Sequence, residues 1–312
     1  MRLLVTGAGG MLGQDVVGAA RERGHEVTGL SRSDLDITDG AAVARTIRDI
    51  CPQAVFNCAA WTDVDGAEAN EEEATEVNGE GAGNVARASA EAGAVLVHLS
   101  SDYVFDGNGR APYVESDPVK PLSAYGRSKL AGEREVADAG PRHVIVRSSW
   151  LFGLGGGNFV ETMLRLGADQ DELRVVNDQI GCPTFTGHLA GALLDLAGGQ
   201  ALGIHHVAGA GACSWHAFAI EIFRQAGIEV RVDPTTTAQI DRPAPRPPYS
   251  VLATARDDGV ALPEWREGLA DYLTERARVP ASEAASGTHQ AAPEASDGAA
   301  DAEGVSPGEP AA

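Results

Sequence analysis

The feature that most constrains the fold is a glycine-rich turn directly after the first apolar run. Residues 2–6, RLLVT, are followed by Gly7, Gly10 and Gly13 at G-x-x-G-x-x-G spacing, and a helical pattern then extends through Arg23. A tight turn needs a residue that tolerates positive φ, and a bound pyrophosphate needs close backbone approach. The free N–H groups at the start of the helix then face the phosphate. A strand, a glycine turn and a helix in this order predict a dinucleotide-binding unit rather than a flexible loop.

The first 150 residues continue this alternation of short apolar runs and helical patterns. Further strand candidates are residues 25–30, 54–60, 94–101 and 143–150. Strands separated by helices indicate βαβ units and a parallel sheet covered on both faces. The predicted fold class is therefore α/β, a Rossmann-type doubly wound parallel sheet. Residues 1–150 are the predicted dinucleotide-binding domain.

The regular alternation of strand and helix candidates ends after residue 150. Residues 151–278 contain short strand candidates at 173–178, 203–209 and 229–233, and a proline-rich loop at 242–250 that cannot be a central strand. We expect a smaller C-terminal substrate-binding lobe here, with room for elements that return to the first sheet. Residues 279–312 are rich in Ala, Glu, Gly, Pro and Ser and carry no Lys, Arg or aromatic residue. This composition predicts a disordered, acidic, low-complexity tail.

Composition and charge limit the possible partners. The chain of 312 residues is 43% hydrophobic, as in globular proteins, and its formal net charge of -21 opposes binding to nucleic acid or to anionic membranes. No apolar run is long enough to span a bilayer, and no basic leader precedes one, so a cytoplasmic location is expected. The four cysteines form no C-x-x-C pair and no cluster with His, which indicates reduced structural thiols.

The end of the second strand candidate bears on the choice of cofactor. An acidic residue there usually binds a free ribose 2′-hydroxyl, whereas an arginine accommodates a 2′-phosphate. Ser31 and Arg32 occupy this place, so NADPH is favoured, while the nearby Asp34 keeps NADH possible. Asp36 and Ile37 suit the adenine edge.

A tyrosine and a lysine are four residues apart in the stretch SAYGRSKLAGE. On a helix, Tyr125 and Lys129 lie on one face, so a phenol and an ammonium can converge on one point. An exposed helix can carry such a pair without any function. The chain contains only two lysines, however, which makes this spacing less expected by chance.

Together the glycine turn, the stretch HLSSDYVFDG and the Tyr125-x-x-x-Lys129 pair resemble the extended short-chain dehydrogenase/reductase superfamily. The segments SSDYVFDG, YGRSKLAGE, RSSWLFG, NFVETMLRL, VVNDQIGCPT and PRPPYS more closely resemble the dTDP-4-dehydrorhamnose reductase family. This similarity runs from Met1 to about residue 275 in the same order. It implies NADPH-dependent reduction of the C4 ketone of dTDP-4-dehydro-6-deoxy-L-mannose to dTDP-L-rhamnose, in dTDP-rhamnose biosynthesis.

The resemblance also implies catalytic roles for three residues. A ketone that takes up a hydride becomes an alkoxide and needs a proton, which Tyr125 can donate if its pKa is brought down toward neutrality. Lys129 favours the phenolate electrostatically and can reach the nicotinamide ribose. Ser101 can hydrogen-bond the carbonyl oxygen and stabilise the developing charge, although a strand-end serine often only satisfies backbone groups.

Further positions follow from the same resemblance. The residues expected to face the cofactor are Gly7, Gly10, Met11, Leu12, Gly13, Arg32, Asp36, Ile37, Ala59, Ala60, Thr62, Leu99, Tyr125 and Lys129. The residues expected to face the sugar nucleotide are Ser101, Asp102, Tyr103, Trp150, Asn177, Gln179 and Arg246, the last against the diphosphate.

The sequence departs from the family in two places. Pro248-Tyr249-Ser250 stands where relatives often have Asn-Ser, which puts part of the sugar-nucleotide contact in doubt. Some relatives bind magnesium through carboxylates at a dimer contact. Asp15 could serve, but His188 falls near where a Glu is expected, so no metal is predicted to be required.

Two other functions are also compatible with this sequence. The chain could reduce another dTDP-deoxysugar, because loops set the stereochemistry. It could also be a non-catalytic NADP-binding regulatory subunit of S-adenosylmethionine synthetase, although the intact Ser101, Tyr125 and Lys129 set argues against a pure binding role. Epimerases and dehydratases share that set, but the chain length and the motifs NDQIGCPT and SSDYVFDG disfavour them. The expected assembly is a monomer or a weak homodimer.

Overall fold

The computed structural model describes residues 1–199, 201–279 and 295–296. The strands of its main sheet are β1 Arg2–Thr6, β2 Glu26–Leu30, β3 Ala54–Asn57, β4 Val95–Ser101, β5 His143–Ser148 and β10 Gly203–His206. Within the described residues these six strands lie in the order β10-β5-β4-β3-β1-β2. Every neighbouring pair is parallel. The predicted parallel α/β sheet is confirmed.

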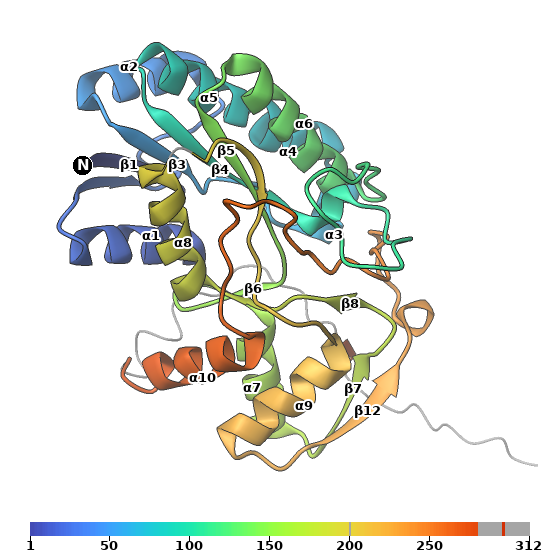
Figure 1. The fold of residues 1–312 in the computed structure, drawn as a ribbon. Helices are drawn as coiled ribbons and strands as arrows, with labels where there is room; N and C mark the ends of the chain where they lie inside the picture. The colour runs from blue at the N-terminus through green and yellow to red at the C-terminus, as the bar shows by residue number, and fades with distance from the viewer. Residues whose placement is uncertain (200, 280–294, 297–312) are drawn as a thin grey trace, which may run out of the picture.

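Helices cover both faces of this sheet because successive strand residues point to opposite sides. Leu3 and Val5 of β1 belong to one buried cluster and Leu4 to another. The first cluster includes residues of α1 and α8, and the second includes residues of α2, α5 and α6, on the other face of the sheet (Figure 1). The bounds are α1 Met11–Glu22, α2 Gly40–Ile50, α5 Ala82–Glu91, α6 Ala124–Ala139 and α8 Thr186–Gly198.

Five short helices lie in the connections between the longer elements of the described residues. They are α3 Val64–Ala69, α4 Glu71–Thr75, the π-helix η1 Glu76–Gly81, and the 3₁₀ helices η2 Asp102–Val104 and η3 Thr237–Gln239. α3 and α4 follow β3 and pack against α6, so residues that follow β3 in sequence lie beside the Tyr125 helix.

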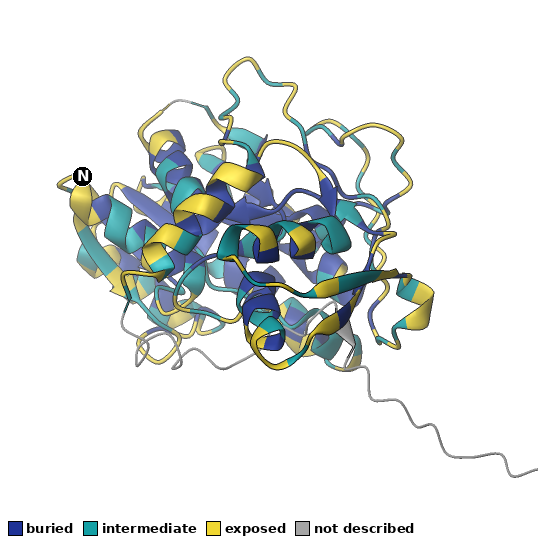
Figure 2. Cartoon of the chain, turned by 90° about the horizontal axis from the view of Figure 1, so that it is seen from below, coloured by how far each residue is buried: buried dark blue, intermediate teal, exposed yellow. Residues whose placement is uncertain are grey.

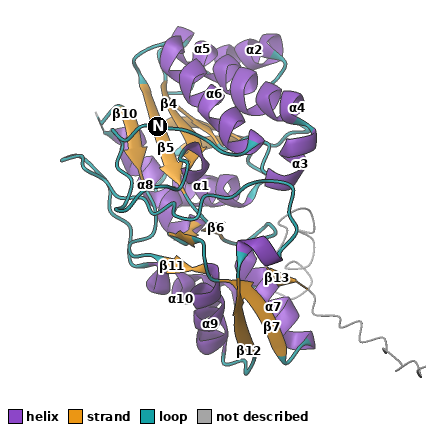
Figure 3. Ribbon diagram, turned by 90° about the vertical axis from the view of Figure 1, so that its right-hand side faces the viewer, coloured by secondary structure: helices purple, strands orange, loops and turns teal. Residues whose placement is uncertain are grey.

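A second body lies beyond the carboxyl end of the sheet (Figure 3). Its elements are α7 Phe159–Asp169, β7 Glu172–Val176, α9 Trp215–Ala226, β12 Arg231–Thr235, α10 Trp265–Arg276 and β13 Ala295–Ser296. β7 pairs with β12 in parallel and with β13 antiparallel. Two short pairs join the bodies: β6 Leu151–Phe152 with β9 Thr184–Phe185, and β8 Ile180–Gly181 with β11 Cys213–Ser214.

The second body has its own apolar core, made by aromatic side chains. Phe152, Phe218, Trp265 and Tyr272 are all buried there. Figure 2 shows buried residues along the inner sides of helices in both bodies and exposed residues on their outer sides. An apolar core of this kind can hold the surrounding loops in fixed positions.

The chain order does not divide cleanly between the two bodies. β10 and α8 come after residue 150, yet β10 pairs with β5 and α8 packs against α1. This agrees with the expectation that some later elements return to the first sheet, while the boundary at residue 150 stays a prediction. The predicted tail lies outside the described residues apart from Val279 and β13.

Candidate active site

The glycine turn is packed tightly against the loop that follows β3. Gly7 has a φ of 67°, and a Cβ there would lie 2.5 Å from the backbone nitrogen of Ala59. A Cβ at Gly13 would collide with the Gly7 carbonyl oxygen. β1 and β3 are neighbours, with β2 on the far side of β1, so this turn lies where the strand order reverses. That crevice is where open α/β sheets bind nucleotides.

The start of α1 fits a phosphate. Its N-cap is Gly10, and no side chain caps the helix. The first N–H groups of a helix have no partner within the helix, so those of Met11 and Leu12 can face a bound anion. The residues present therefore fit a dinucleotide cofactor at this place.

The segment after β2 leaves Arg32 exposed. The Asp34 carboxylate accepts hydrogen bonds from the Ser31 backbone N–H at 2.9 Å and the Ser31 hydroxyl at 2.6 Å. These bonds lower the pKa of Asp34. Asp36 is also exposed and accepts from Thr38.

The remaining residues predicted to face the cofactor lie around the same edge. Ala59 and Ala60 are half-buried and Thr62 is exposed in the loop after β3. Ile37 and Leu99 are buried, so only their backbone or a small part of each side chain is open to a ligand.

The structure brings Ser101, Tyr125 and Lys129 together at the end of β4. The Ser123 hydroxyl caps α6 by accepting from Gly126 N–H, which fixes the start of the helix. Lys129 is only 3% exposed and donates to the Leu99 carbonyl at 2.6 Å. The Ser101 hydroxyl donates to Asp102 at 2.9 Å and accepts from the Tyr103 backbone N–H at 3.2 Å.

Burial and neighbouring charges shift the pKa values of Tyr125 and Lys129. Desolvation and then the charge of Asp102 raise the pKa of Tyr125 to about 12, while the bond with Ser101 lowers it. Desolvation lowers the pKa of Lys129 to about 8, partly offset by Glu133. The pKa of Tyr125 thus lies above its usual value rather than near neutrality, because burial favours the neutral phenol.

Tyr103 and Asp102 extend the cluster on the side of η2. The ring of Tyr103 meets that of Tyr125 edge-on, with centroids 5.5 Å apart. Asp102 is 1% exposed, and one of its oxygens, Oδ2, has no hydrogen-bond partner. Desolvation raises the pKa of Asp102 to about 6.

Trp150, Asn177 and Gln179 form a second group, between the two bodies. The Trp150 ring stacks on Trp215 with centroids 3.5 Å apart, and Trp215 Nε1 donates to Gln179 at 3.1 Å. Asn177 accepts from Ser214 at 2.7 Å. Trp150 has a φ of 48°, a left-handed conformation that is strained for an aromatic residue.

Arg246 is held by a carboxylate rather than directed toward solvent. Its side chain is 6% exposed and donates to both oxygens of Asp65 in α3, at 3.0 and 2.9 Å. Arg242 and the backbone N–H of Ala244 also contact Asp65. Asp65 was not anticipated from the sequence, since it lies 181 residues from Arg246.

Sequence reasoning also missed a buried ion pair beneath the catalytic cluster. Glu133 accepts two hydrogen bonds from Arg147, at 2.8 and 2.7 Å, and both side chains are below 5% exposed. Ser100, next to Ser101, donates to the same carboxylate at 2.6 Å. The spacing of Tyr125, Lys129 and Glu133 at four-residue intervals could have predicted a shared helix face.

Two features are absent from the described ranges, a cluster of metal-ligating side chains and a membrane-spanning helix. No group of three or more His, Cys, Asp or Glu side chains gathers there as a metal site. Across the same residues, no helix combines the length and apolarity needed to cross a bilayer. His188, at the position considered for a metal ligand, pairs with Asp271 at 2.9 Å.

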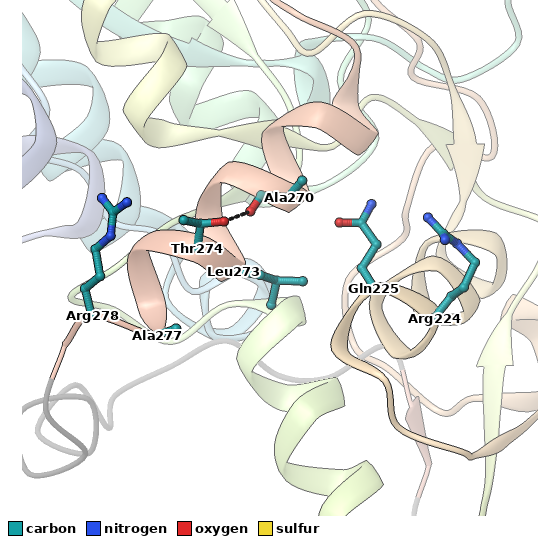
Figure 4. Close-up of a pocket in the computed structure, with 7 residues that line it drawn as sticks. All are labelled: Arg224, Gln225, Ala270, Leu273, Thr274, Ala277 and Arg278. Carbon is teal, nitrogen blue, oxygen red and sulfur yellow. Dashed lines mark hydrogen bonds between the residues drawn. The ribbon is translucent and has the colours of Figure 1, made fainter.

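An open surface hollow of about 720 Å³ lies between α9 and α10, in the second body (Figure 4). Gln225, Leu273 and Arg278 are among the side chains that line it. Thr274 donates to the Ala270 carbonyl there, within α10. No residue of the predicted site lines this hollow.

A doubly wound sheet with a glycine turn and a Ser-Tyr-Lys cluster at its carboxyl edge defines an extended short-chain dehydrogenase/reductase. The family model described as RmlD substrate binding domain matches residues 1–278. A dTDP-4-dehydrorhamnose reductase of Streptomyces griseus is 47% identical over 280 residues, which cover 86% of this chain and 92% of that protein. The chain belongs to the dTDP-4-dehydrorhamnose reductase family.

Two further relatives bear on cofactor and substrate. A solved structure of dTDP-4-dehydrorhamnose reductase from Bacillus anthracis, in complex with NADP, has a TM-score of 0.86 and 38% identity; the match covers 88% of this chain and 99% of that one. A probable dTDP-4,6-dihydroxy-2-methyloxan-3-one 4-ketoreductase of Streptomyces antibioticus is 42% identical, over 86% of this chain and 93% of that protein.

Proposed function

We propose that this protein reduces the C4 ketone of dTDP-4-dehydrorhamnose with NADPH and forms dTDP-L-rhamnose. The observation that carries the proposal is the convergence of Ser101, Tyr125 and Lys129 at the end of β4. The glycine turn after β1 lies at the same edge of the sheet, beside β3. Hydride donor and proton donor can therefore approach one carbonyl together.

The cofactor would be held by the glycine turn and the loops after β2 and β3. N–H groups at the start of α1 would hold its pyrophosphate, Arg32 would hold its 2′-phosphate, and Lys129 would hold its nicotinamide ribose. Bound NADPH supplies the hydride.

Tyr125 acts as the proton donor in this proposal. With a pKa of about 12 its phenol is protonated at neutral pH and so carries the proton to be donated, and the nearby Lys129 ammonium would lower that pKa as the phenolate forms. Ser101 donates to the carbonyl oxygen and stabilises the charge that develops there. The Lys129 ammonium then stabilises the phenolate left after proton transfer.

The sugar nucleotide would lie between the two bodies. Asp102, Tyr103 and Trp150 face the sugar, Asn177 and Gln179 border the cleft, and the charge of Arg246 favours the diphosphate. We further propose a cytoplasmic enzyme, a monomer or weak homodimer that requires no magnesium. A charge of -21 opposes any binding of nucleic acid or anionic membrane.

The direct test incubates purified protein with NADPH and the dTDP-4-keto-6-deoxy sugar of L-lyxo configuration, and follows NADPH oxidation. NMR of the product identifies the configuration at C4. The Streptomyces antibioticus relative favours one alternative, reduction of a different dTDP-deoxysugar ketone. Turnover of such a ketone with little turnover of the rhamnose precursor would replace the proposal by that alternative.

Replacing Arg32 with alanine is expected to raise KM for NADPH by about 10- to 100-fold, the effect of losing a charge-assisted hydrogen bond. KM for NADH should change little, because NADH has no 2′-phosphate. Arg45→Ala, an exposed arginine on α2, is the matched control. Equal effects on both cofactors would mean that Arg32 points into solvent.

The low pKa of Lys129 predicts a pH dependence. Desolvation lowers this pKa to about 8, so the ammonium is present below that pH and is lost as the pH rises through it. Turnover at saturating substrates should therefore fall across this range. A kcat that stays flat to about two units above that pKa would contradict a role for the Lys129 charge.

A further inference from the structure

The short helix α3 contacts two parts of the proposed site. One of its carboxylates binds the proline-rich loop, and another binds the start of α6. Asp65 binds the proline-rich loop through Arg246, Arg242 and the Ala244 N–H. Glu68, three residues later, accepts a hydrogen bond from the backbone N–H of Ala124 at 2.7 Å. Ala124 is the first residue of α6 and directly precedes Tyr125.

The contact with the loop is strong and well oriented. Arg246 uses two N–H groups on the two oxygens of Asp65, and its side chain is nearly excluded from solvent. Such paired, charge-assisted bonds fix orientation as well as position. Partial burial raises the pKa of Asp65, but the hydrogen bonds from Arg246 and from Ala244 N–H, with the charges of the two arginines, outweigh burial and lower it, so the carboxylate stays ionised at neutral pH.

The C-terminal part of the proline-rich loop is held by backbone hydrogen bonds to β8. Ile180 of β8 exchanges backbone hydrogen bonds with Pro248 and Ser250. A Cβ at Gly107 would collide with Pro247 and Pro248, which shows how closely the loop approaches the segment after η2. Asp65 therefore supplies a side-chain attachment that holds the arginine end of the loop to the first body.

The contact with α6 acts on the catalytic helix at its start. The N–H of Ala124 is one of the groups that a helix cannot satisfy internally. Glu68 satisfies it from outside the helix, while Ser123 caps Gly126. Because Tyr125 is the next residue, a shift of this end displaces the phenol.

We propose that α3 is a bracket that positions both halves of the active site. In this bracket Asp65 orients the two arginines toward a diphosphate and Glu68 fixes the Tyr125 end of α6. Both are positioning residues, since neither is placed against the reacting atoms. The inference rests on the proposed function for the identity of the substrate, and its binding arm can be tested without turnover.

The binding arm uses dTDP, titrated calorimetrically into the NADPH-loaded protein. Asp65→Asn keeps the shape of the side chain but loses its charge, and should weaken dTDP binding by about tenfold or more. NADPH affinity should stay unchanged and reports an intact fold. If the Asn variant fails to bind NADPH, Asp65→Glu replaces it, since the longer side chain displaces the arginines and the same weakening is expected.

The catalytic arm compares two variants of Glu68. Glu68→Ala removes the acceptor for Ala124 N–H and should lower kcat by roughly tenfold to a hundredfold through misplacement of Tyr125. Glu68→Gln retains an acceptor oxygen and should keep most of the activity. dTDP affinity should be unaffected in both. Glu72→Gln, an exposed residue of α4, is the matched control.

Separate outcomes distinguish this proposal from the function itself. Wild-type protein that binds dTDP but reduces no keto sugar would contradict the proposed function and leave the Asp65 arm standing. Unchanged or tighter dTDP binding in Asp65→Asn would overturn the bracket, because Asp65 would then be neutral toward the diphosphate or compete with it. A Glu68→Ala variant with normal kcat, or a Gln variant as impaired as the Ala variant, would also overturn it.

Discussion

Replacing Tyr125 with phenylalanine is expected to lower kcat by about 10²–10⁴-fold, the usual contribution of a positioned general acid. The substitution removes only the phenolic oxygen, so the aromatic contact with Tyr103 and the packing of α6 should remain. KM for NADPH should be unchanged. The measurement is kcat at saturating NADPH and keto sugar, with circular dichroism to confirm the fold.

A control separates the chemical role from a structural one. Tyr103→Phe makes the same deletion on the neighbouring ring and should lower kcat far less, because Tyr103 is proposed only to face the sugar. Tyr125→Phe with kcat within about threefold of the wild type, where chemistry is rate-limiting, would contradict the mechanism, since general acid catalysis is worth far more.

Replacing Glu133 with alanine is expected to lower the free energy of unfolding by about 3–5 kcal/mol. The reason is that Arg147 would keep its charge in a buried site without its carboxylate partner. Ser100 would lose its acceptor as well, which loosens β4 beside Ser101. Chemical denaturation followed by circular dichroism measures the loss.

Glu135 on the same helix provides the matched control. It pairs with Arg87 at 2.9 Å, but both side chains are close to half exposed. Glu135→Ala should therefore lower stability by less than about 1 kcal/mol. A Glu133→Met/Arg147→Met double variant should be more stable than Glu133→Ala, since it leaves no buried charge unpaired. Equal losses for Glu133→Ala and Glu135→Ala would contradict the account of the buried pair.

The main sheet was predictable from sequence because its signals are local. Each strand is a short apolar run, and the glycine turn predicts the first βα connection from only a few residues. The return of β10 to the edge of the sheet was harder to assign, because a four-residue strand carries no mark of its partner. The actual partner, β5, lies more than fifty residues earlier in the chain.

The candidate site was predictable where residues share a helix face or end a strand, as Tyr125, Lys129 and Ser101 do. The partners of Arg246 and Arg147 were not, because these ion pairs join elements that meet only in the folded chain. The upward shift of the Tyr125 pKa could not be predicted either, since desolvation depends on packing that no local pattern reveals. One signal was present for Arg147: a charged residue inside an apolar run indicates a buried charge that needs a partner.

The most direct test of the central claim follows the hydride itself. Wild-type protein is incubated with the keto sugar and NADPH that carries deuterium at the transferred position of the nicotinamide, and the product is examined by NMR. The account predicts deuterium bonded to C4 of dTDP-L-rhamnose, with none at the other ring carbons. Oxidation of NADPH without deuterium at C4, or a product with the opposite configuration at that carbon, would contradict it.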